Sequence, residues 1–244
     1  MYNLLYTEAL KLRSSKILWL IPAGGIIPVV LNFINKIDNP ILLNSTTWQE
    51  FIGGCQLMIS ELIPSLIFLL AGFVFTREYH DNTIYTLFTY PITRLKIMVS
   101  KTLILLPLLF SLNLLACISS VTLGLVFIHG QITWALLCVQ LRVYLIMFIV
   151  QFALVPAAIT LGIISRSIIA SATGGICCIL ALVSFLNSKF NVYFPWCVPA
   201  LITNKIAIYT QFWDIDLTTA WRTLIIAFLI PLIFNMVYYS KSDA

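Results

Sequence analysis

The chain has 244 residues, of which 61% are hydrophobic and only 9% are charged. Soluble domains are nearer half apolar and about a quarter charged, so this composition excludes an ordinary soluble protein. The net charge of +5 is modest, and no nucleic-acid partner is expected. We predict one domain over residues 1–244, an all-α polytopic membrane protein with six transmembrane helices.

Residues 1–15 carry two sets of side chains at helical spacing. The apolar set comprises Tyr2, Leu5, Ala9 and Leu12. The polar set falls on another face and comprises Thr7, Glu8, Lys11 and Ser15. Such a helix lies in the membrane interface, with its basic residues toward anionic head groups. We predict an amphipathic elbow helix here; the alternative is a plain cytoplasmic start whose charges set the topology.

Six apolar stretches follow. The length of each is close to or above the about 20 residues that a helix needs to cross the hydrocarbon core. They are predicted at residues 17–35, 56–76, 98–127, 136–164, 167–187 and 223–239. The third and fourth are long and must tilt, kink or project from the bilayer. Pro107 and Pro156 are the predicted kink points. The alternative for the third span is a break near Asn113 or at Ser119-Ser120.

Charges gather between the second and third spans, over residues 77–96. A short helix is predicted there, with N-cap candidates at Asp81, Asn82 and Thr83. Its apolar stripe is formed by Ile84, Leu87 and Phe88, and Pro91 stops it. A short, partly apolar helix presented to the cytoplasm is a surface that another protein can grip. The alternative is a charged loop whose stripe packs on the bundle.

Two charges fall inside spans. Glu61 and Arg142 each lie about six residues from the outer end of a span, which is roughly 9 Å at 1.5 Å per residue. Equal depth predicts a polar contact inside the bundle or along a substrate path. The alternative is that both side chains extend outward to the head groups.

Small residues recur four apart in the fifth span, as Ala170 with Gly174 and Ser171 with Gly175. Such pairs let helices approach closely, either within the chain or against a second copy. The contact within the chain is the simpler interpretation.

Residues 188–222 are too apolar for a free loop, and Pro195 and Pro199 prevent one continuous helix. We predict short re-entrant helices in the outer leaflet before the last span. The aromatic residues that suit an interfacial belt are Tyr193, Trp196, Tyr209, Trp213 and Trp221. Together with Glu61 and Arg142, Trp196 and Trp213 are the predicted contacts of a substrate path.

The distribution of lysine and arginine predicts the orientation. With the N-terminus cytoplasmic, the inner side holds Lys11, Arg13, Lys16, Arg77, Arg94, Lys96, Lys101, Arg166 and Lys241. The outer side then holds Lys36, Lys189, Lys205 and Arg222. We therefore predict that both termini are cytoplasmic.

Motifs for chemistry are missing from the sequence. It contains no GxxxxGK[ST] phosphate-binding loop, no HExxH and no Cys/His cluster with metal spacing. His80 and His129 have no other predicted metal ligand near them in the sequence. A disulfide between Cys55 and Cys197 on the outer side is the less favoured interpretation of those two cysteines. We predict no catalytic residue, metal or cofactor in this chain, so energy for transport must come from a partner or an ion gradient.

The charged stretch resembles a segment of ABC-2 type permease subunits, R-E-Y-x-x-G-T-x-x-x-L-x-x-x-P-x-x-R followed by a lysine. The matching residues here are Arg77, Glu78, Tyr79, Thr83, Leu87, Pro91, Arg94 and Lys101. Asn82 stands where the family usually has glycine, so the turn is expected to differ there. The family start E-x-x-K-x-[RK] is matched by Glu8, Lys11 and Arg13.

The resemblance implies that residues 77–96 couple the permease to a separate ATP-binding subunit, which carries ATP and Mg. The expected coupling residues are Arg77, Glu78, Tyr79, Thr83, Ile84, Leu87, Phe88, Pro91 and Arg94. A second permease chain, identical or related, and membrane lipids are the other expected partners. The chain looks most like the bacitracin-resistance and lantibiotic-immunity permeases, which implies export of peptide antibiotics or other amphipathic molecules from a Gram-positive cell membrane. The alternatives are an ion-coupled transporter and a non-catalytic membrane assembly protein.

Overall fold

A computed structural model describes residues 2–13, 15–37, 46–81, 93–128, 132–207 and 216–241. Every regular element in these ranges is a helix. Six segments of this part of the chain are long and apolar enough to cross a membrane: Lys16–Ile37, Trp48–Tyr79, Arg94–Phe127, Trp134–Ser165, Ile168–Leu186 and Leu217–Ser240. The prediction of an all-α protein with six spans is therefore confirmed.

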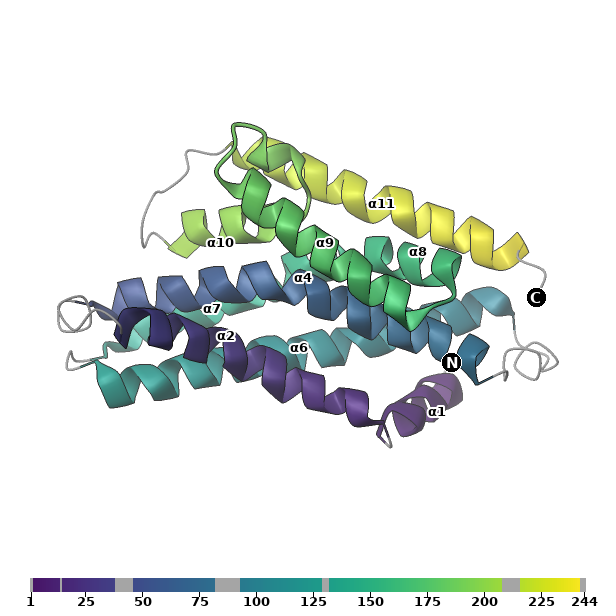
Figure 1. Ribbon diagram of the computed structural model, residues 1–244, viewed down its shortest axis with the longest axis horizontal. Helices are drawn as coiled ribbons and strands as arrows, with labels where there is room; N and C mark the ends of the chain where they lie inside the picture. Colours follow the sequence, from purple (N-terminus) through teal and green to yellow (C-terminus); the bar gives the residue numbers. More distant parts are fainter. Residues whose placement is uncertain are drawn as a thin grey trace.

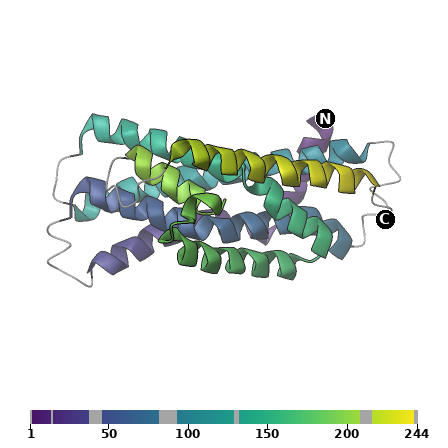
Figure 2. The same cartoon turned by 90° about the horizontal axis from the view of Figure 1, so that it is seen from above.

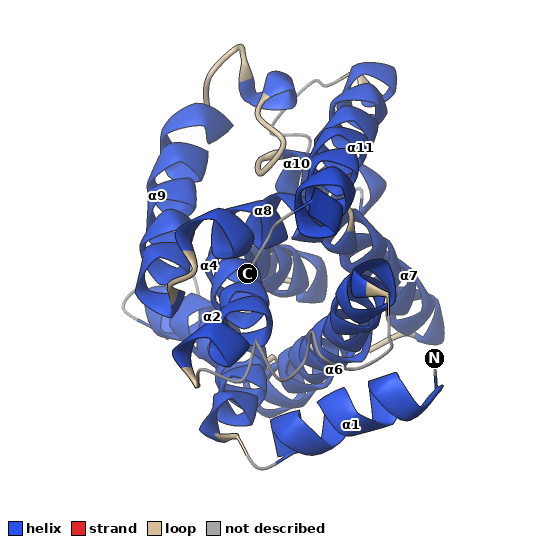
Figure 3. Ribbon diagram, turned by 90° about the vertical axis from the view of Figure 1, so that its right-hand side faces the viewer, coloured by secondary structure: helices blue, strands red, loops and turns tan. Residues whose placement is uncertain are grey.

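The first helix, α1 (Tyr2–Arg13), lies across one end of the bundle beside α6 (Figure 3). Glu8 and Leu12 are buried against the bundle, whereas Tyr6 and Leu10 are exposed. Glu8, on the predicted polar face, therefore faces protein instead of water, and the amphipathic elbow helix stays a prediction. A short turn, η1 (Lys16–Trp19), then leads into α2 (Leu20–Ile37).

Helix α4 (Trp48–His80) is the central element of the bundle. It starts with a capping box, in which the Thr47 hydroxyl accepts from the Glu50 N–H and the Glu50 carboxylate accepts from the Thr47 N–H. Its 33 residues make it about 50 Å long, well beyond the thickness of the hydrocarbon core. The helix packs against α2, α6, α8, α9 and α10, so it is buried along most of its length (Figures 1 and 2).

Helix α6 (Arg94–Phe127) runs without interruption through Pro107, Asn113 and Ser119, so the alternative of a break in this span is wrong. The fourth span, by contrast, is divided into α7 (Trp134–Phe152) and α8 (Val155–Ser165). Pro156 sits in the first turn of α8, where its missing N–H leaves no helical hydrogen bond unmade. This agrees with the predicted kink. The amide of Asn235 donates to the Pro156 carbonyl at 2.8 Å and ties the last helix to this point.

Helix α9 (Ile168–Leu186) packs closely along α4. Ser171 and Gly175 are buried at that contact. A Cβ atom on Gly175 would lie 2.8 Å from the Cα of Ser65, so only glycine fits at this distance. The interpretation of this small-residue pair as a contact within the chain is confirmed.

The segment after α9 contains two short helices, η2 (Asn191–Tyr193) and α10 (Val198–Ala207), before α11 (Leu217–Lys241). Trp196 is 7% exposed and its ring lies 5.0 Å from that of Phe68, so it is a core residue and its assignment to an interfacial belt is wrong. Trp213 and Tyr209 lie outside the described residues. Cys55 and Cys197 are free and buried, and no disulfide joins them.

Candidate functional site

Three consecutive side chains at the end of α4 contact three different parts of the molecule. Successive residues of a helix point about 100° apart. Arg77, Glu78 and Tyr79 therefore face in different directions from the last turn of α4, just before residues 82–92, which lie outside the described ranges. The helix ends at Asp81, whose N–H donates to the carbonyls of Arg77 and Tyr79. Asp81 was a predicted N-cap of the next helix, and in the structure it is the C-cap of α4.

Glu78 joins α4 to both α1 and α6. One of its carboxylate oxygens accepts from the Lys11 ammonium at 2.9 Å, and the other accepts from the Lys101 ammonium at 2.6 Å. The side chains of Glu78 and Lys101 are only 7% and 1% exposed. Lys101 also donates to the Val74 carbonyl at 3.2 Å. Glu78 is thus enclosed by its own chain, with both oxygens in use.

Glu8 completes the charge balance of this cluster. Its carboxylate accepts from Lys11 at 2.6 Å, one helical turn away on α1. Burial lowers the pKa of the Lys11 ammonium, but hydrogen bonds to the Glu8 and Glu78 carboxylates outweigh that effect and raise the pKa above its ordinary value. Two carboxylates and two ammonium groups therefore form a neutral network, which we call the charge cluster: Glu8, Lys11, Glu78 and Lys101.

The two neighbours of Glu78 fasten further elements. The Arg77 guanidinium donates to the Lys11 carbonyl at 2.9 Å and pairs with Asp81 at 3.3 Å. The ring of Tyr79 lies under the guanidinium of Arg166, 5.0 Å from its centroid. Arg166 ends α8 in the left-handed conformation, at φ 51°, and so forms the turn into α9. The Arg77-Glu78-Tyr79 triplet thus connects α4 to α1, α6 and the α8–α9 turn.

The remaining predicted coupling residues are only partly described. Arg94 is the first residue of α6 and is partly buried. Thr83, Ile84, Leu87, Phe88 and Pro91 lie outside the described residues.

The sequence did not predict that the N-terminal motif with Glu8 and Lys11 contacts the motif with Glu78 and Lys101. Glu8 and Lys11, three residues apart, belong on one face of a helix. Lys101 lies in an otherwise apolar stretch, and that isolation signals a buried partner. These clues do not indicate which carboxylate Lys101 binds, because Glu78 lies 23 residues earlier in the chain.

The predicted substrate-path residues are not brought together. Glu61 on α4 is half-buried and Arg142 on α7 is exposed, and no ion pair joins these two described side chains. Trp196 packs in the core on Phe68 instead. Nowhere in the described ranges do three or more His, Cys, Asp or Glu side chains gather as a metal site would require.

The sequence of the chain matches the family described as ABC-2 family transporter protein over residues 4–184. This match runs from α1 to the last turn of α9 and includes all four residues of the charge cluster. The chain belongs to the ABC-2 transporter family. Members of this family are membrane permeases without an ATPase site of their own, and they pair with an ATP-binding cassette subunit. A search of curated proteins found no match to this permease.

Proposed function

We propose that this ABC-2 permease is the membrane-spanning subunit of an exporter that removes peptide antibiotics of the lantibiotic or bacitracin type, or other amphipathic molecules, from the membrane. A second permease chain and two ATP-binding subunits complete the transporter. The termini face the cytoplasm of a Gram-positive cell. Residues 82–92, between α4 and α6, dock on the ATP-binding subunit, which supplies ATP and Mg.

The observation that carries the proposal is the position of Glu78. It is buried at the point where α4 enters the proposed docking segment, and it holds Lys101 on the helix that leaves this segment. Lys11 adds α1 to the same carboxylate. Buried ion pairs resist separation, because parting them leaves an uncompensated charge in an apolar surrounding.

This arrangement supports a mechanical role for the charge cluster. A force applied to residues 82–92 enters α4 and α6 together, since Glu78 and Lys101 hold the two helix ends in register. Arg77 and Tyr79 spread the same displacement to α1 and to the α8–α9 turn. The ends of four elements would then move as one body when the ATP-binding subunits close.

Leu87→Asp tests the docking segment. A charge in an apolar contact is costly, by several kcal/mol when the site is fully buried, so co-purification with the ATP-binding subunit should be lost. The spans are unchanged, so the permease should still accumulate in the membrane. Phe190→Asp is the control, because Phe190 is an exposed apolar residue after α9, at the opposite end of the bundle.

Glu78→Ala tests the cluster separately from docking. It should retain the ATP-binding subunit but uncouple ATP hydrolysis from stimulation by an added peptide such as nisin. Normal assembly in Leu87→Asp together with normal stimulated hydrolysis in Glu78→Ala would refute the proposed coupling.

A further inference from the structure

Five buried side-chain polar atoms of the described residues have no hydrogen-bond partner. Two of them belong to one pair of contacting amides, Asn113 on α6 and Gln151 on α7. Both residues are 2% exposed, and each lies near the middle of its span, Arg94–Phe127 or Trp134–Ser165. Buried polar groups nearly always have a partner, and the hydrocarbon core contains no bulk water to supply one. The two atoms therefore need a partner inside the protein.

The two amides make one hydrogen bond to each other and leave a second one unmade. The Asn113 Nδ2 donates to Gln151 Oε1 at 2.9 Å and to the Leu109 carbonyl at 3.0 Å. The Asn113 Oδ1 acceptor and the Gln151 Nε2 donor are the atoms without a partner among the described residues. Rotating one amide by half a turn would bring two N–H groups or two oxygens together, and rotating both would leave the other donor and the other acceptor unpaired. One donor and one acceptor thus remain in each orientation.

The chemistry of these two atoms identifies what can bind them. The N–H group of Gln151 would repel a cation, and the carbonyl oxygen of Asn113 would repel an anion. A water molecule accepts from the first and donates to the second, and a buried water typically makes about three hydrogen bonds of this kind. Gln151 is also in the last turn of α7, where carbonyl groups lose their helical donors and offer water further acceptors.

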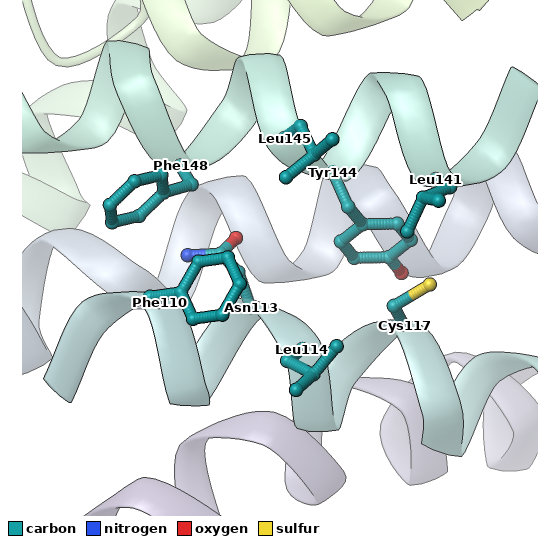
Figure 4. Close-up of a pocket in the computed structure, with 8 residues that line it drawn as sticks. All are labelled: Phe110, Asn113, Leu114, Cys117, Leu141, Tyr144, Leu145 and Phe148. Carbon is teal, nitrogen blue, oxygen red and sulfur yellow. The ribbon is translucent and has the colours of Figure 1, made fainter. Parts of the chain in front are cut away.

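Apolar side chains separate the amide pair from the lipid. Figure 4 shows Asn113 turned from α6 toward α7, beside Phe110 and Phe148. The rings of Phe110 and Phe148 lie 5.5 Å apart across the two helices, and Phe110 is exposed whereas Asn113 is buried. Asn113 also lines a cavity of about 40 Å³ between α6 and α7. One water needs about 10–15 Å³ by this measure, so a small rotation of the amides gives it room.

We propose that the Asn113–Gln151 amide pair binds one ordered water molecule, which accepts from Gln151 Nε2 and donates to Asn113 Oδ1. The water joins α6 to α7 near the middle of the membrane, immediately before the α7–α8 break. It is a structural ligand of the permease and does not depend on the proposed export function or on the charge cluster.

Radiolytic labelling of the full-length permease in detergent tests this site. A millisecond X-ray pulse converts bound water to hydroxyl radicals, which oxidise a neighbouring methionine, and mass spectrometry measures the sulfoxide. Met147 is fully buried and lies one helical turn before Gln151 on the same face of α7. Met98 is the control, because it is also buried and lies about 22 Å from Asn113 along α6. Met147 should be oxidised several-fold faster than Met98.

A double variant, Asn113→Leu with Gln151→Leu, removes both groups that hold the water. It should slow the oxidation of Met147 to the rate of Met98. Asn32→Leu is the matched control, because it removes a buried amide of α2 that donates to the Phe51 carbonyl, and it should leave the oxidation of Met147 unchanged. The comparison of the two methionines in the wild type needs no substitution, so it decides the question even if the double variant does not fold.

Equal oxidation of Met147 and Met98 in the wild type would overturn the proposal, and this is the result expected if Gln151 donates directly to Asn113 Oδ1. Unchanged oxidation of Met147 in a folded double variant would also overturn it. Hydrogen peroxide added without X-rays should oxidise the two methionines equally slowly. A faster reaction of Met147 with peroxide would show a path open to solvent instead of a bound water, and the proposal would fail. None of these readouts depends on ATP or transport, so their failure is distinct from failure of the proposed export function.

Discussion

At the scale of single residues, the unusual feature of this permease is a buried carboxylate that holds two ammonium groups, that of the buried Lys101 and that of the partly exposed Lys11. Desolvating such charges costs several kcal/mol per ion, and the cost is recovered only when geometry and hydrogen bonding are good. Both oxygens of Glu78 are used, at 2.9 and 2.6 Å. A less costly apolar contact would join the same helices, so we attribute the ion pairs to the fixed register that they impose.

Glu78→Gln should destabilise the permease by about 3–5 kcal/mol, because Lys101 would remain charged, buried and without its partner. Adding Lys101→Met should recover much of this loss, since the double variant buries no unpaired charge at that position. The free energy of unfolding in mixed micelles measures both. Asp81→Asn is the matched control: its pair with Arg77 is substantially exposed, so at most about 1 kcal/mol is expected. Additive losses in the double variant would refute the pairing.

Asp216 provides a pH-dependent prediction at the start of α11. Hydrogen bonds from the Thr219 and Thr218 hydroxyls and from the Thr218 N–H lower the pKa of Asp216 from 3.8 to about 2. Because the folded pKa is the lower one, the stabilisation is complete above the ordinary value and is lost as the pH falls through about 2.

Asp216→Asn isolates this effect, because asparagine does not titrate, although its single side-chain oxygen can accept only the hydrogen bonds now made to one carboxylate oxygen. The difference in thermal midpoint between wild type and this variant should shrink between about pH 5 and pH 2. Other carboxylates titrate equally in both proteins and cancel. A difference that does not change over this range would contradict the assigned hydrogen bonds.

At the scale of elements, close helix packing depends on particular small residues. Lipid offers no hydrophobic force that drives helices together, so close approach and shape complementarity hold α4 and α9 in contact. Ser171 and Gly175 provide the flat surface of α9, and Ser65 lies opposite on α4. The α7–α8 break adds a second fixed point, where Asn235 of α11 caps the Pro156 carbonyl.

Gly175→Ala should therefore destabilise the α4–α9 contact, although alanine is the better helix former. The added methyl group would lie 2.8 Å from a backbone carbon of α4, so the helices must separate. Overpacking of this kind costs about 1–3 kcal/mol. Cys177→Ala, on the exposed face of α9, is the control and should be neutral. If Gly175→Ala has the same thermal midpoint as the wild type, α4 and α9 are less tightly packed than the 2.8 Å distance implies.

At the scale of the whole molecule, the two ends of the bundle differ in the elements and side chains that they carry. One end carries α1, the end of α4, the start of α6 and the end of α11 (Figure 1), together with the charge cluster. The other end carries η2, α10 and the start of α7, with Trp134 and Tyr193 exposed. The ion pairs found among the described residues thus lie at the end where the proposed ATP-binding subunit docks.

The orientation of the bundle is open to direct test. In cells producing a chain with Cys138 and Cys177 replaced by serine, an impermeant maleimide should label Lys189→Cys and not Lys96→Cys. Both lysines are exposed in the structure, so a difference in labelling reports the side of the membrane. Lys96→Cys should become reactive once the membrane is permeabilised. The reverse pattern would place the termini outside.

Fold class and family follow from the amino-acid sequence alone. Apolar length predicts membrane-crossing helices without knowledge of their packing, because in lipid every backbone polar group must be satisfied within its own segment. The Pro156 break and the Ser171–Gly175 contact were also local enough to predict. The Arg77-Glu78-Tyr79 motif indicates the family because its residues are contiguous in the chain.

The partners that the charged and aromatic side chains contact, by contrast, depend on the tertiary structure. The sequence predicts equal depth for Glu61 and Arg142, but pairing also depends on how each helix is rotated, which hydrophobic length does not specify. Trp196 entered the core because the chain folds back after α9. Glu78 gained Lys11 and Lys101 because α1 and α6 both reach the end of α4. An ion pair between residues far apart in sequence depends on the arrangement of whole helices, and that arrangement arises from packing along their full length.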